Sequence, residues 1–417
     1  MCRTIVRFIG FLAAVVGILG TLGYAQPREI TVMGGTGLEN VYRPLFDQFE
    51  QQSGIKVNTQ VIAYANRFDA IATAAVSGVA TFDVADVDVI WTPAFAAAGW
   101  LVDVTEQFPD LRERGVAQAS IDSVEYQGRI WGVPFFNSAK HFYYNQGMLE
   151  AAGFTRPPQT LDELMQYSIA LTHGEGDNKV YGSSWSWVQD EALVVDWVLL
   201  AYAVSDVPLF TDDGQPQFTQ SGGVQALQWM VDMVNSGSID PASLSNHEDE
   251  VSNTFLAGKA AMEINWEGLP AAADADNPDK SKIVGQLRRS LIPAQPPIVS
   301  STVLGPEGLA IMANSTHQAE ALEFLNFILS EDLQRQGFIW GGFFPIYDRL
   351  YNDPELAAVL PQFSLYGEQF TYAHPRPKLV NYIEVADVIR EELHSALLGQ
   401  KTPQQALDDA TQRIAAL

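Results

Sequence analysis

The sequence has few of the residues on which several classes of protein chemistry depend. Among 417 residues there is one cysteine, Cys2, and 24 lysines and arginines stand against 50 aspartates and glutamates, giving a formal net charge of −26. This acidic excess argues against nucleic acids and anionic membranes as partners. The longest apolar run beyond the N-terminus, Ala192 to Val204, is too short to cross a bilayer and contains Asp196, so it predicts a buried helix.

The N-terminus has the pattern of a secretion signal. Two arginines precede an apolar stretch, and Gly-Tyr-Ala at residues 23–25 places small side chains at the −3 and −1 positions of a cleavage site. The sequence therefore predicts a signal peptide at residues 1–25 and a periplasmic mature protein. Cleavage after Ala25 removes Cys2, so the mature chain is expected to contain no disulfide, no thiol nucleophile and no cysteine metal ligand.

Motifs of the common enzyme classes are absent or incomplete. There is no G-x-S-x-G nucleophile elbow and no P-loop Lys-Ser/Thr pair. Gly35-x-Gly37 is placed as in a dinucleotide loop, but Asn40 stands at the third glycine position, which favours a plain strand-to-helix turn. The acidic group that begins at His247 has no second histidine at helical spacing, so we interpret it as a solvated helix start. No metal or cofactor is expected.

Strand and helix patterns alternate along the chain and predict an α/β protein. Glu29 to Met33 has the pattern of a strand, a helical pattern follows, and residues 55–61 alternate as a second strand. Strand, helix and strand in this order are typical of α/β folds. Thr160 and Ser315 are each followed three residues later by Glu or Gln, so each is predicted to cap a helix.

Aromatic residues are the most conspicuous feature of the composition, with 9 Trp, 14 Tyr and 22 Phe. Several are expected at strand ends or in loops beside acids and amides. An indole face offers an apolar platform for a sugar ring, and neighbouring Asp, Glu, Asn and Arg can hydrogen-bond its hydroxyls. Core packing is the more frequent role of any single aromatic. Composition alone therefore does not identify a sugar site.

Several short motifs occur in an order that carries more information than any one of them. They are Asp88-Val-Ile-Trp91, Gly128-Arg-Ile-Trp-Gly-Val-Pro134, Phe255-Leu-Ala-Gly-Lys-Ala-Ala-Met262 followed by Asn265-Trp266, Gly341-Gly-Phe-Phe-Pro345, and Arg376-Pro377. From about Ile30 to the C-terminus, the chain resembles the extracellular solute-binding proteins of ABC transporters, family 1, the maltose-binding-like group. Its trehalose/maltose-binding branch looks most similar.

The resemblance implies a type II periplasmic-binding fold, an α/β architecture of two lobes joined by about three crossovers. The expected first lobe is residues 26–137 plus 309–345, and the expected second lobe is 138–308 plus 346–417. Ligands of open α/β sheets bind beyond the strand C-termini, here in the cleft between the lobes. The implied protein is a monomer that binds a sugar, without catalysis, by lobe closure and delivers it to ABC permease subunits in the inner membrane.

Matching positions to the family pattern gives the expected ligand contacts. Trp266 is expected to be a stacking platform, and Glu39 a hydroxyl contact in the first strand–helix loop. Arg376 is expected to be a site arginine, and the loop at 341–343 is expected to approach the sugar with bare backbone. The full expected set is Gly37, Glu39, Trp91, Phe136, Trp185, Glu191, Trp266, Glu307, Gly341, Gly342, Phe343 and Arg376.

Two positions depart from the family pattern. Ser138 stands where close relatives often place an aspartate, and Glu307 brings an acid into the second crossover. These exchanges leave open a different hydroxyl pattern or a basic or otherwise non-sugar ligand. Two further classes also stay open: a secreted glycoside hydrolase that uses paired carboxylates, and a surface module that binds no small ligand.

Overall fold

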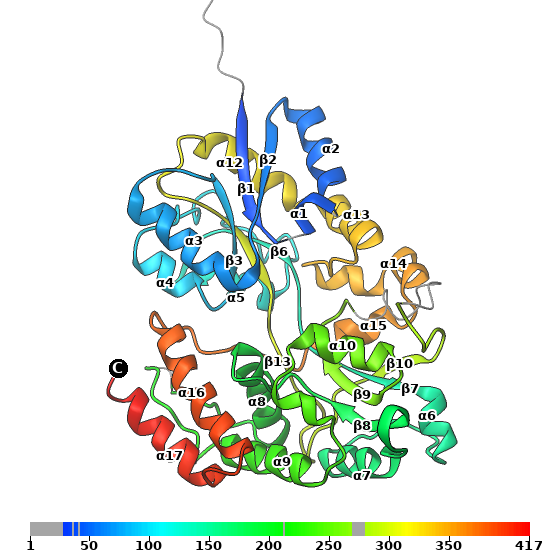
Figure 1. Cartoon of the computed structure of the whole chain (residues 1–417). Coiled ribbons are helices and arrows are strands. Elements are labelled where there is room, and N and C mark those ends of the chain that lie inside the picture. The colour runs from blue at the N-terminus through cyan, green and yellow to red at the C-terminus, as the bar shows by residue number, and fades with distance from the viewer. Residues whose placement is uncertain (1–27, 36, 41, 212, 269–279) are drawn as a thin grey trace, which may run out of the picture.

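Two α/β lobes lie one above the other and are joined by extended segments that pass between them (Figure 1). The computed structural model describes residues 28–35, 37–40, 42–211, 213–268 and 280–417. The predicted signal peptide lies outside the described residues. No helix among those described is both long enough and apolar enough to span a membrane. The predicted two-lobed α/β architecture is confirmed.

The first lobe is built on a five-stranded sheet with the order β2-β1-β3-β12-β6. Strands β1 (Glu29–Gly34), β2 (Lys56–Val61) and β3 (Val84–Asp88) are parallel, and β12 (Glu307–Ile311) runs antiparallel between β3 and β6 (Val133–Phe136). Both strands predicted from residues 29–61 are confirmed. Because β12 is reversed, its first residue lies beside the last residues of β3 and β6.

Helices cover both faces of the first sheet (Figure 1). The helices of this lobe are α1 (Gly37–Asn40), α2 (Arg43–Ser53), α3 (Tyr64–Ser77), α4 (Thr92–Ala97), α5 (Gln118–Val124), α12 (Gln318–Ile328), α13 (Glu331–Gly341), α14 (Pro354–Val359) and α15 (Phe363–Phe370). The predicted cap at Ser315 is wrong, because α12 begins at Gln318 with His317 before it. The Ser315 hydroxyl instead donates to Asp83 Oδ1 at 2.6 Å, which ties this loop to the sheet.

The second lobe contains a four-stranded sheet with the order β10-β7-β9-β8. Its strands are β7 (His141–Asn145), β8 (Tyr181–Ser184), β9 (Ala260–Asn265) and β10 (Leu287–Ser290). Its helices are α6 (Gln146–Ala151), α7 (Leu161–Leu171), α8 (Glu191–Val204), α9 (Gly223–Asn235), α10 (Glu248–Leu256), α16 (Tyr382–Leu397) and α17 (Pro403–Ile414). The shorter elements of the chain are β4 (Glu125–Tyr126), β5 (Arg129–Ile130), β11 (Thr302–Val303), β13 (Ala373–His374), and the 3-10 turns Gly176–Asn178, Pro241–Leu244 and Asp348–Asn352.

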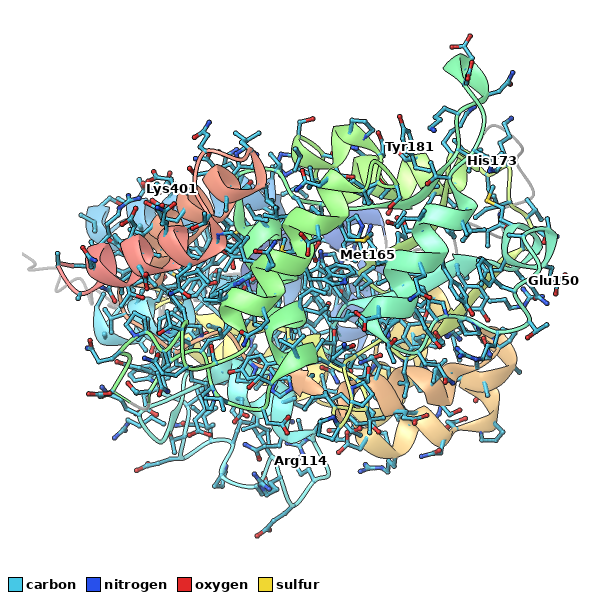
Figure 2. The ribbon with its side chains drawn as sticks, turned by 90° about the horizontal axis from the view of Figure 1, so that it is seen from below. Arg114, Glu150, Met165, His173, Tyr181 and Lys401 are labelled. Atoms are coloured by element: carbon cyan, nitrogen blue, oxygen red, sulfur yellow. The ribbon has the colours of Figure 1, made fainter. Side chains whose placement is uncertain are left out.

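Local sequence explains two of these helices. Thr160 caps α7, as predicted, by accepting a hydrogen bond from the Glu163 N–H at 3.1 Å. The predicted buried helix is α8, whose apolar residues are buried all round in the second-lobe core. Helices also cover the lower face of this lobe (Figure 2), where the labelled Met165 belongs to α7 and Lys401 lies between α16 and α17.

Core packing differs from the expected lobe division at one boundary. The expected second lobe resumed at residue 346, but Leu350, Leu356 and Phe363 pack in the same buried cluster as Ile30 and Val32 of β1. Residues 346–366 therefore pack with the first lobe. Among the described residues the chain passes between the lobes near residues 137–140, 304–307 and 371–381.

Strand β9 carries a buried carboxyl group with a measurable consequence. Glu263 is 1% exposed, both its carboxyl oxygens have no hydrogen-bond partner among the described residues, and burial raises its pKa to about 8. The folded protein then binds this proton more tightly than the unfolded chain does. We expect the unfolding free energy to fall between about pH 5 and 8, by up to about 1.4 kcal/mol per pH unit from this group. Glu263→Gln should reduce that slope in urea titrations; an unchanged slope would contradict the assignment.

Candidate functional site

A cavity of about 430 Å³ lies where the ends of the two sheets face each other. Strand register explains one wall, because Glu307 of β12 pairs with both Asp88 of β3 and Phe136 of β6. The opposite wall comes from the first turns of α8 and α10 and from the residues after β9. The lining residues are Tyr64, Asp88, Phe136, Ser138, Asp190, Glu191, Ala192, Val195, His247, Glu248, Asp249, Trp266, Glu267, Gly305, Glu307 and Arg376.

Trp266 lies in this cavity directly after β9 and is held in place by polar contacts. Its backbone N–H donates to Asn265 Oδ1 at 2.9 Å, and its indole Nε1 donates to Glu248 Oε1 at 3.3 Å. Lys140 Nζ lies 5.5 Å from the ring centre, within the range of a cation–π contact. The indole is half-buried, so it presents a fixed apolar surface to the cavity.

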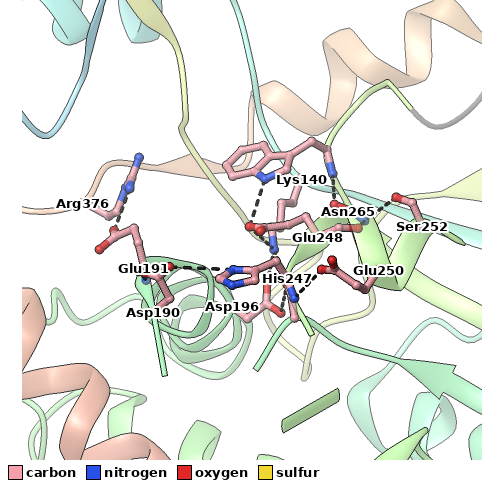
Figure 3. A network of polar contacts seen from close by, with 12 residues as sticks. Lys140, Asp190, Glu191, Asp196, His247, Glu248, Glu250, Ser252, Asn265 and Arg376 are labelled. Carbon is pink, nitrogen blue, oxygen red and sulfur yellow. Dashed lines mark hydrogen bonds and ion pairs between the residues drawn. The ribbon is translucent and has the colours of Figure 1, made fainter. Parts of the chain in front are cut away.

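A buried ion pair supports the indole from the second lobe. Lys140 Nζ lies 2.7 Å from Asp196 Oδ1 and 3.7 Å from Glu248 Oε1, as Figure 3 shows. Burial raises the pKa of Asp196 to about 6, although the Lys140 charge acts in the opposite direction. Because Lys140 is fully buried, this pair fixes the α8 end of the cavity wall against the indole.

Gly305, in the second crossover, has no side chain and so leaves space for the Trp266 indole. A Cβ placed on Gly305 would lie 2.7 Å from indole carbons of Trp266, closer than carbon atoms approach without moving. We expect Gly305→Ala to displace the ring at a cost of about 1–3 kcal/mol, and to weaken ligand binding about tenfold in calorimetry. Gly268→Ala is the control, because a Cβ there meets nothing within 4 Å. Unchanged affinity in Gly305→Ala would mean that the indole position does not matter.

Arg376 joins the two lobes at the base of the cavity. Its Nη1 donates to Glu191 Oε1 at 2.7 Å, and its Nη2 lies 3.5 Å from Asp88 Oδ1 (Figure 3 shows the contact with Glu191). Tyr382 Oη also donates to Glu191 Oε1, at 2.6 Å. The Arg376 side chain is 3% exposed, and its Nε has no hydrogen-bond partner among the described residues. Glu191 opens α8 in the second lobe and Asp88 ends β3 in the first, so Arg376 spans the cleft.

A second arginine organises the first-lobe wall. Arg67 Nη1 lies 2.7 Å from Asp86 Oδ2 and 3.0 Å from Glu307 Oε2, and its guanidinium lies 5.0 Å from the Tyr64 ring centre. Burial and the charge of Glu307 raise the pKa of Asp86 well above its ordinary value. Arg67 is thus shared by two acids of the first lobe.

Glu267 is the acid that faces the first crossover. Its Oε2 accepts a hydrogen bond from Ser138 Oγ at 3.0 Å, and among the described residues no lysine, arginine or histidine forms an ion pair with it. Burial raises the pKa of Glu267 to about 7. Position 138 holds a serine where the family pattern often has an aspartate. The Glu267 carboxylate reaches this serine from the second lobe.

Five of the twelve expected contact residues line the cavity together: Phe136, Glu191, Trp266, Glu307 and Arg376. Two others lie next to this group. The Phe343 ring is 5.8 Å from that of Phe136 and stacks on Tyr42 at 3.8 Å, and a Cβ on Gly37 would lie 3.7 Å from Phe343.

The remaining expected residues lie away from the cavity lining. Trp91 and Trp185 are 3% and 1% exposed and belong to hydrophobic cores, Trp91 beside Phe95 and Trp185 stacked on Trp187 at 4.9 Å. Glu39 is exposed on α1, and Gly341 and Gly342 end α13, with Gly342 at φ 72°. The structure thus places these five outside the wall that Trp266 and Arg376 form.

Several lining residues were not singled out from the sequence. His247 begins α10 as predicted, with Glu250 completing a capping box, but this helix start also faces the cavity. Asp88 is the last residue of β3 and begins the Asp88-Val-Ile-Trp91 motif, from which Trp91 alone was chosen as a contact. Glu267 follows the Asn265-Trp266 motif, so adjacency to a recognised motif was the available signal. Among the described residues there is no group of three or more acids, histidines or cysteines that could hold a metal ion.

Residues 44–360 match the family model described as bacterial extracellular solute-binding protein. The chain belongs to this family. A probable ABC transporter-binding protein of Deinococcus radiodurans is 25% identical over 331 residues, which cover 78% of this chain and 77% of the relative. The sn-glycerol-3-phosphate-binding periplasmic protein UgpB of Pectobacterium atrosepticum is 26% identical over 318 residues, covering 70% and 66%.

Solved structures of solute-binding proteins share the fold over nearly the whole chain. Maltose-bound MalE3 of T. maritima superposes with a TM-score of 0.84 and 27% identity, covering 93% of this chain and all of that one. An ABC transporter solute-binding protein of Thermotoga lettingae, bound to α-D-tagatose, gives a TM-score of 0.82 and 26% identity over 93% and 98%. This chain is therefore an ABC-type extracellular solute-binding protein whose structural neighbours include sugar binders.

Proposed function

We propose that this solute-binding protein holds a saccharide in the interlobe cavity and delivers it, chemically unchanged, to an ABC permease from the periplasm. The observation that carries the proposal is the pairing of a fixed indole, Trp266, with charged hydrogen-bonding groups from both lobes in one cavity. Aromatic faces bind the C–H surface of a sugar ring, and carboxylates and guanidinium groups bind its hydroxyls. The cavity volume of about 430 Å³ lies within the range of small-molecule sites, and a short saccharide is the proposed occupant.

The residues proposed to contact the ligand come from both lobes, which explains why binding would close them. Glu307 and Phe136 belong to the first lobe, while Glu191 and Trp266 belong to the second. A ligand that touches both sets has more contacts when the lobes are close, so binding shifts the hinge equilibrium toward closure. The closed, loaded form is the species proposed to dock on the permease. A di- or oligosaccharide of the trehalose or maltose type is the expected class.

The charge of the cavity argues against anionic ligands. Seven of its lining residues are acids, against Arg376 and His247 as the bases that line it. A phosphate placed there would face unfavourable charge and lose its hydration. The glycerol-3-phosphate specificity named for UgpB is therefore not proposed for this chain.

Isothermal titration calorimetry with four ligand groups tests the proposal. The groups are neutral disaccharides and trisaccharides, polyols, amino acids, and sn-glycerol-3-phosphate. Saccharides are expected to bind with one-to-one stoichiometry and to raise the melting temperature by mass action, while sn-glycerol-3-phosphate gives no heat. Tight binding of an amino acid or a phosphate, with no saccharide binding, would contradict the proposal.

Binding without turnover separates this function from a glycoside hydrolase. Glu191 bonds Arg376 and Tyr382, and Glu307 bonds Arg67, so these acids are committed to the walls of the cavity. We expect a bound saccharide to be recovered intact by mass spectrometry after prolonged incubation. Hydrolysis products that disappear on changing a single carboxylate would favour the enzyme instead.

A further inference from the structure

Around the hinge end of the cavity, acids outnumber bases. The acids are Asp86, Asp88, Glu191, Glu267 and Glu307, and the two bases are Arg67 and Arg376. Each arginine already contacts two of the acids: Arg67 pairs with Asp86 and Glu307, and Arg376 with Asp88 and Glu191. Glu267 forms an ion pair with neither arginine. With every group ionised, the cluster would hold three uncompensated negative charges in a partly dehydrated space.

A cluster of this kind is stable only if it binds protons or a cation. Ser138 gives Glu267 one hydrogen bond, which does not neutralise its charge. Burial, together with the nearby charge of Glu307, holds the pKa of Glu267 at about 7. Near neutral pH the empty site therefore carries a proton that a cationic group could replace.

A second polar side chain at the hinge end of the cavity has an atom that lacks a hydrogen-bond partner among the described residues. Arg376 Nε is buried without a hydrogen-bond partner among the described residues and belongs to the cavity wall. Trp266 immediately precedes Glu267 and supplies the apolar face. A Cβ on Gly305 would lie 2.7 Å from the indole and 3.7 Å from Ser138 Oγ, the group that donates to Glu267. A ligand ring on the indole would therefore have substituents near Glu267.

We propose that the preferred ligand is an amino saccharide, whose protonated amine pairs with Glu267 while its sugar ring stacks on Trp266. This inference rests on the proposed function, because it assigns chemistry to the ligand of the same site. The ammonium group neutralises Glu267 and donates hydrogen bonds to its carboxylate. A neutral saccharide leaves Glu267 to keep its proton, so it gains less from the same cavity.

Proton release gives the inference a specific signature. When an ammonium group pairs with Glu267, it favours the ionised carboxylate and lowers its pKa, so binding near pH 7 expels the proton. A neutral saccharide carries no charge that favours the ionised carboxylate, so its binding should release no proton from Glu267. Calorimetry in two buffers that differ in ionisation enthalpy measures the number of protons released for each ligand bound.

The test compares each of several disaccharides in three forms: with hydroxyls only, with one amine, and with that amine N-acetylated. We expect the amine form to bind at least tenfold more tightly than both others at pH 6.5, where Glu267, with a pKa of about 7, still holds most of its proton, and to release that proton on binding. Glu267→Gln should remove the advantage and the release, whereas Glu267→Asp, which keeps the charge, should retain part of both. Glu106→Gln, at an exposed acid outside the cavity, should behave as the unmodified protein.

The outcomes separate the two proposals. Neutral disaccharides that bind as tightly as their amine forms would overturn the amine preference and leave saccharide binding intact. An amine preference that persists in Glu267→Gln, with that variant shown to be folded by its melting curve, would also overturn the assignment to Glu267. If no saccharide in any form binds, the proposed function itself fails.

Discussion

Replacement of Trp266 by alanine is expected to weaken saccharide binding at least thirtyfold. The indole is fixed by its hydrogen bond to Glu248 and by Lys140 beneath it, so it loses little conformational freedom when a ligand ring stacks on it. Well-packed aromatic anchors of this kind typically contribute about 2 kcal/mol or more to binding, which corresponds to that loss of affinity. Titration calorimetry with the tightest saccharide measures the effect.

Two matched variants make the result specific. Trp266→Phe keeps an aromatic face without the Nε1–H, so we expect an intermediate affinity. Trp340→Ala removes a tryptophan that is 53% exposed and outside the cavity lining, and it should bind normally. If Trp266→Ala remains folded and binds as tightly as Trp340→Ala, stacking on Trp266 does not hold the ligand.

Arg376→Met is expected to lower the unfolding free energy by about 3–5 kcal/mol, since removing one partner of a buried ion pair leaves the others uncompensated. Here Asp88 and Glu191 both lose their base. Because these acids belong to different lobes, the same change should also loosen the closed state and weaken ligand binding. Urea denaturation followed by tryptophan fluorescence measures the stability.

A partly exposed arginine supplies the comparison. Arg390 pairs with Asp190 and Asp387 at a side-chain exposure of 30%, and such surface pairs typically contribute less than about 1 kcal/mol. Combining Arg376→Met with Glu191→Gln should recover part of the loss, since one of the stranded charges is removed. If Arg376→Met costs no more than Arg390→Met, Arg376 does not hold the lobes together.

Local patterns in the sequence were sufficient to predict β1, β2 and α8. The strand patterns at residues 29–33 and 55–61 predicted β1 and β2, because successive side chains of a strand point to opposite faces and apolar ones mark the buried face. A run of apolar residues around Asp196 predicted α8. Ser315 shows the limit of such patterns. Its hydroxyl accepts from the N–H of His317, the residue before α12, and donates to Asp83, which lies 232 residues away in the sequence.

A site residue could be predicted from the sequence where a single motif identified the residue and also placed it at the end of a strand. Asn265-Trp266 ends a strand whose C-terminus faces the cleft, so Trp266 was placed by resemblance and strand direction together. Trp185 also follows a strand, β8, but its ring stacks on Trp187 under the buried α8, and the sequence has no signal for that choice. The contacts of Glu267 with Ser138 and of Arg67 with Glu307 join residues 129 and 240 positions apart. Only the fold brings them together.

Small-angle X-ray scattering with and without saccharide tests the central claim most directly. The account predicts that a saccharide which binds in calorimetry lowers the radius of gyration, because it contacts Glu307 and Phe136 in one lobe and Trp266 and Glu191 in the other. The same ligand should leave Trp266→Ala unchanged at a concentration that saturates the unmodified protein. A particle whose radius of gyration stays constant while ligand demonstrably occupies the site would contradict the account.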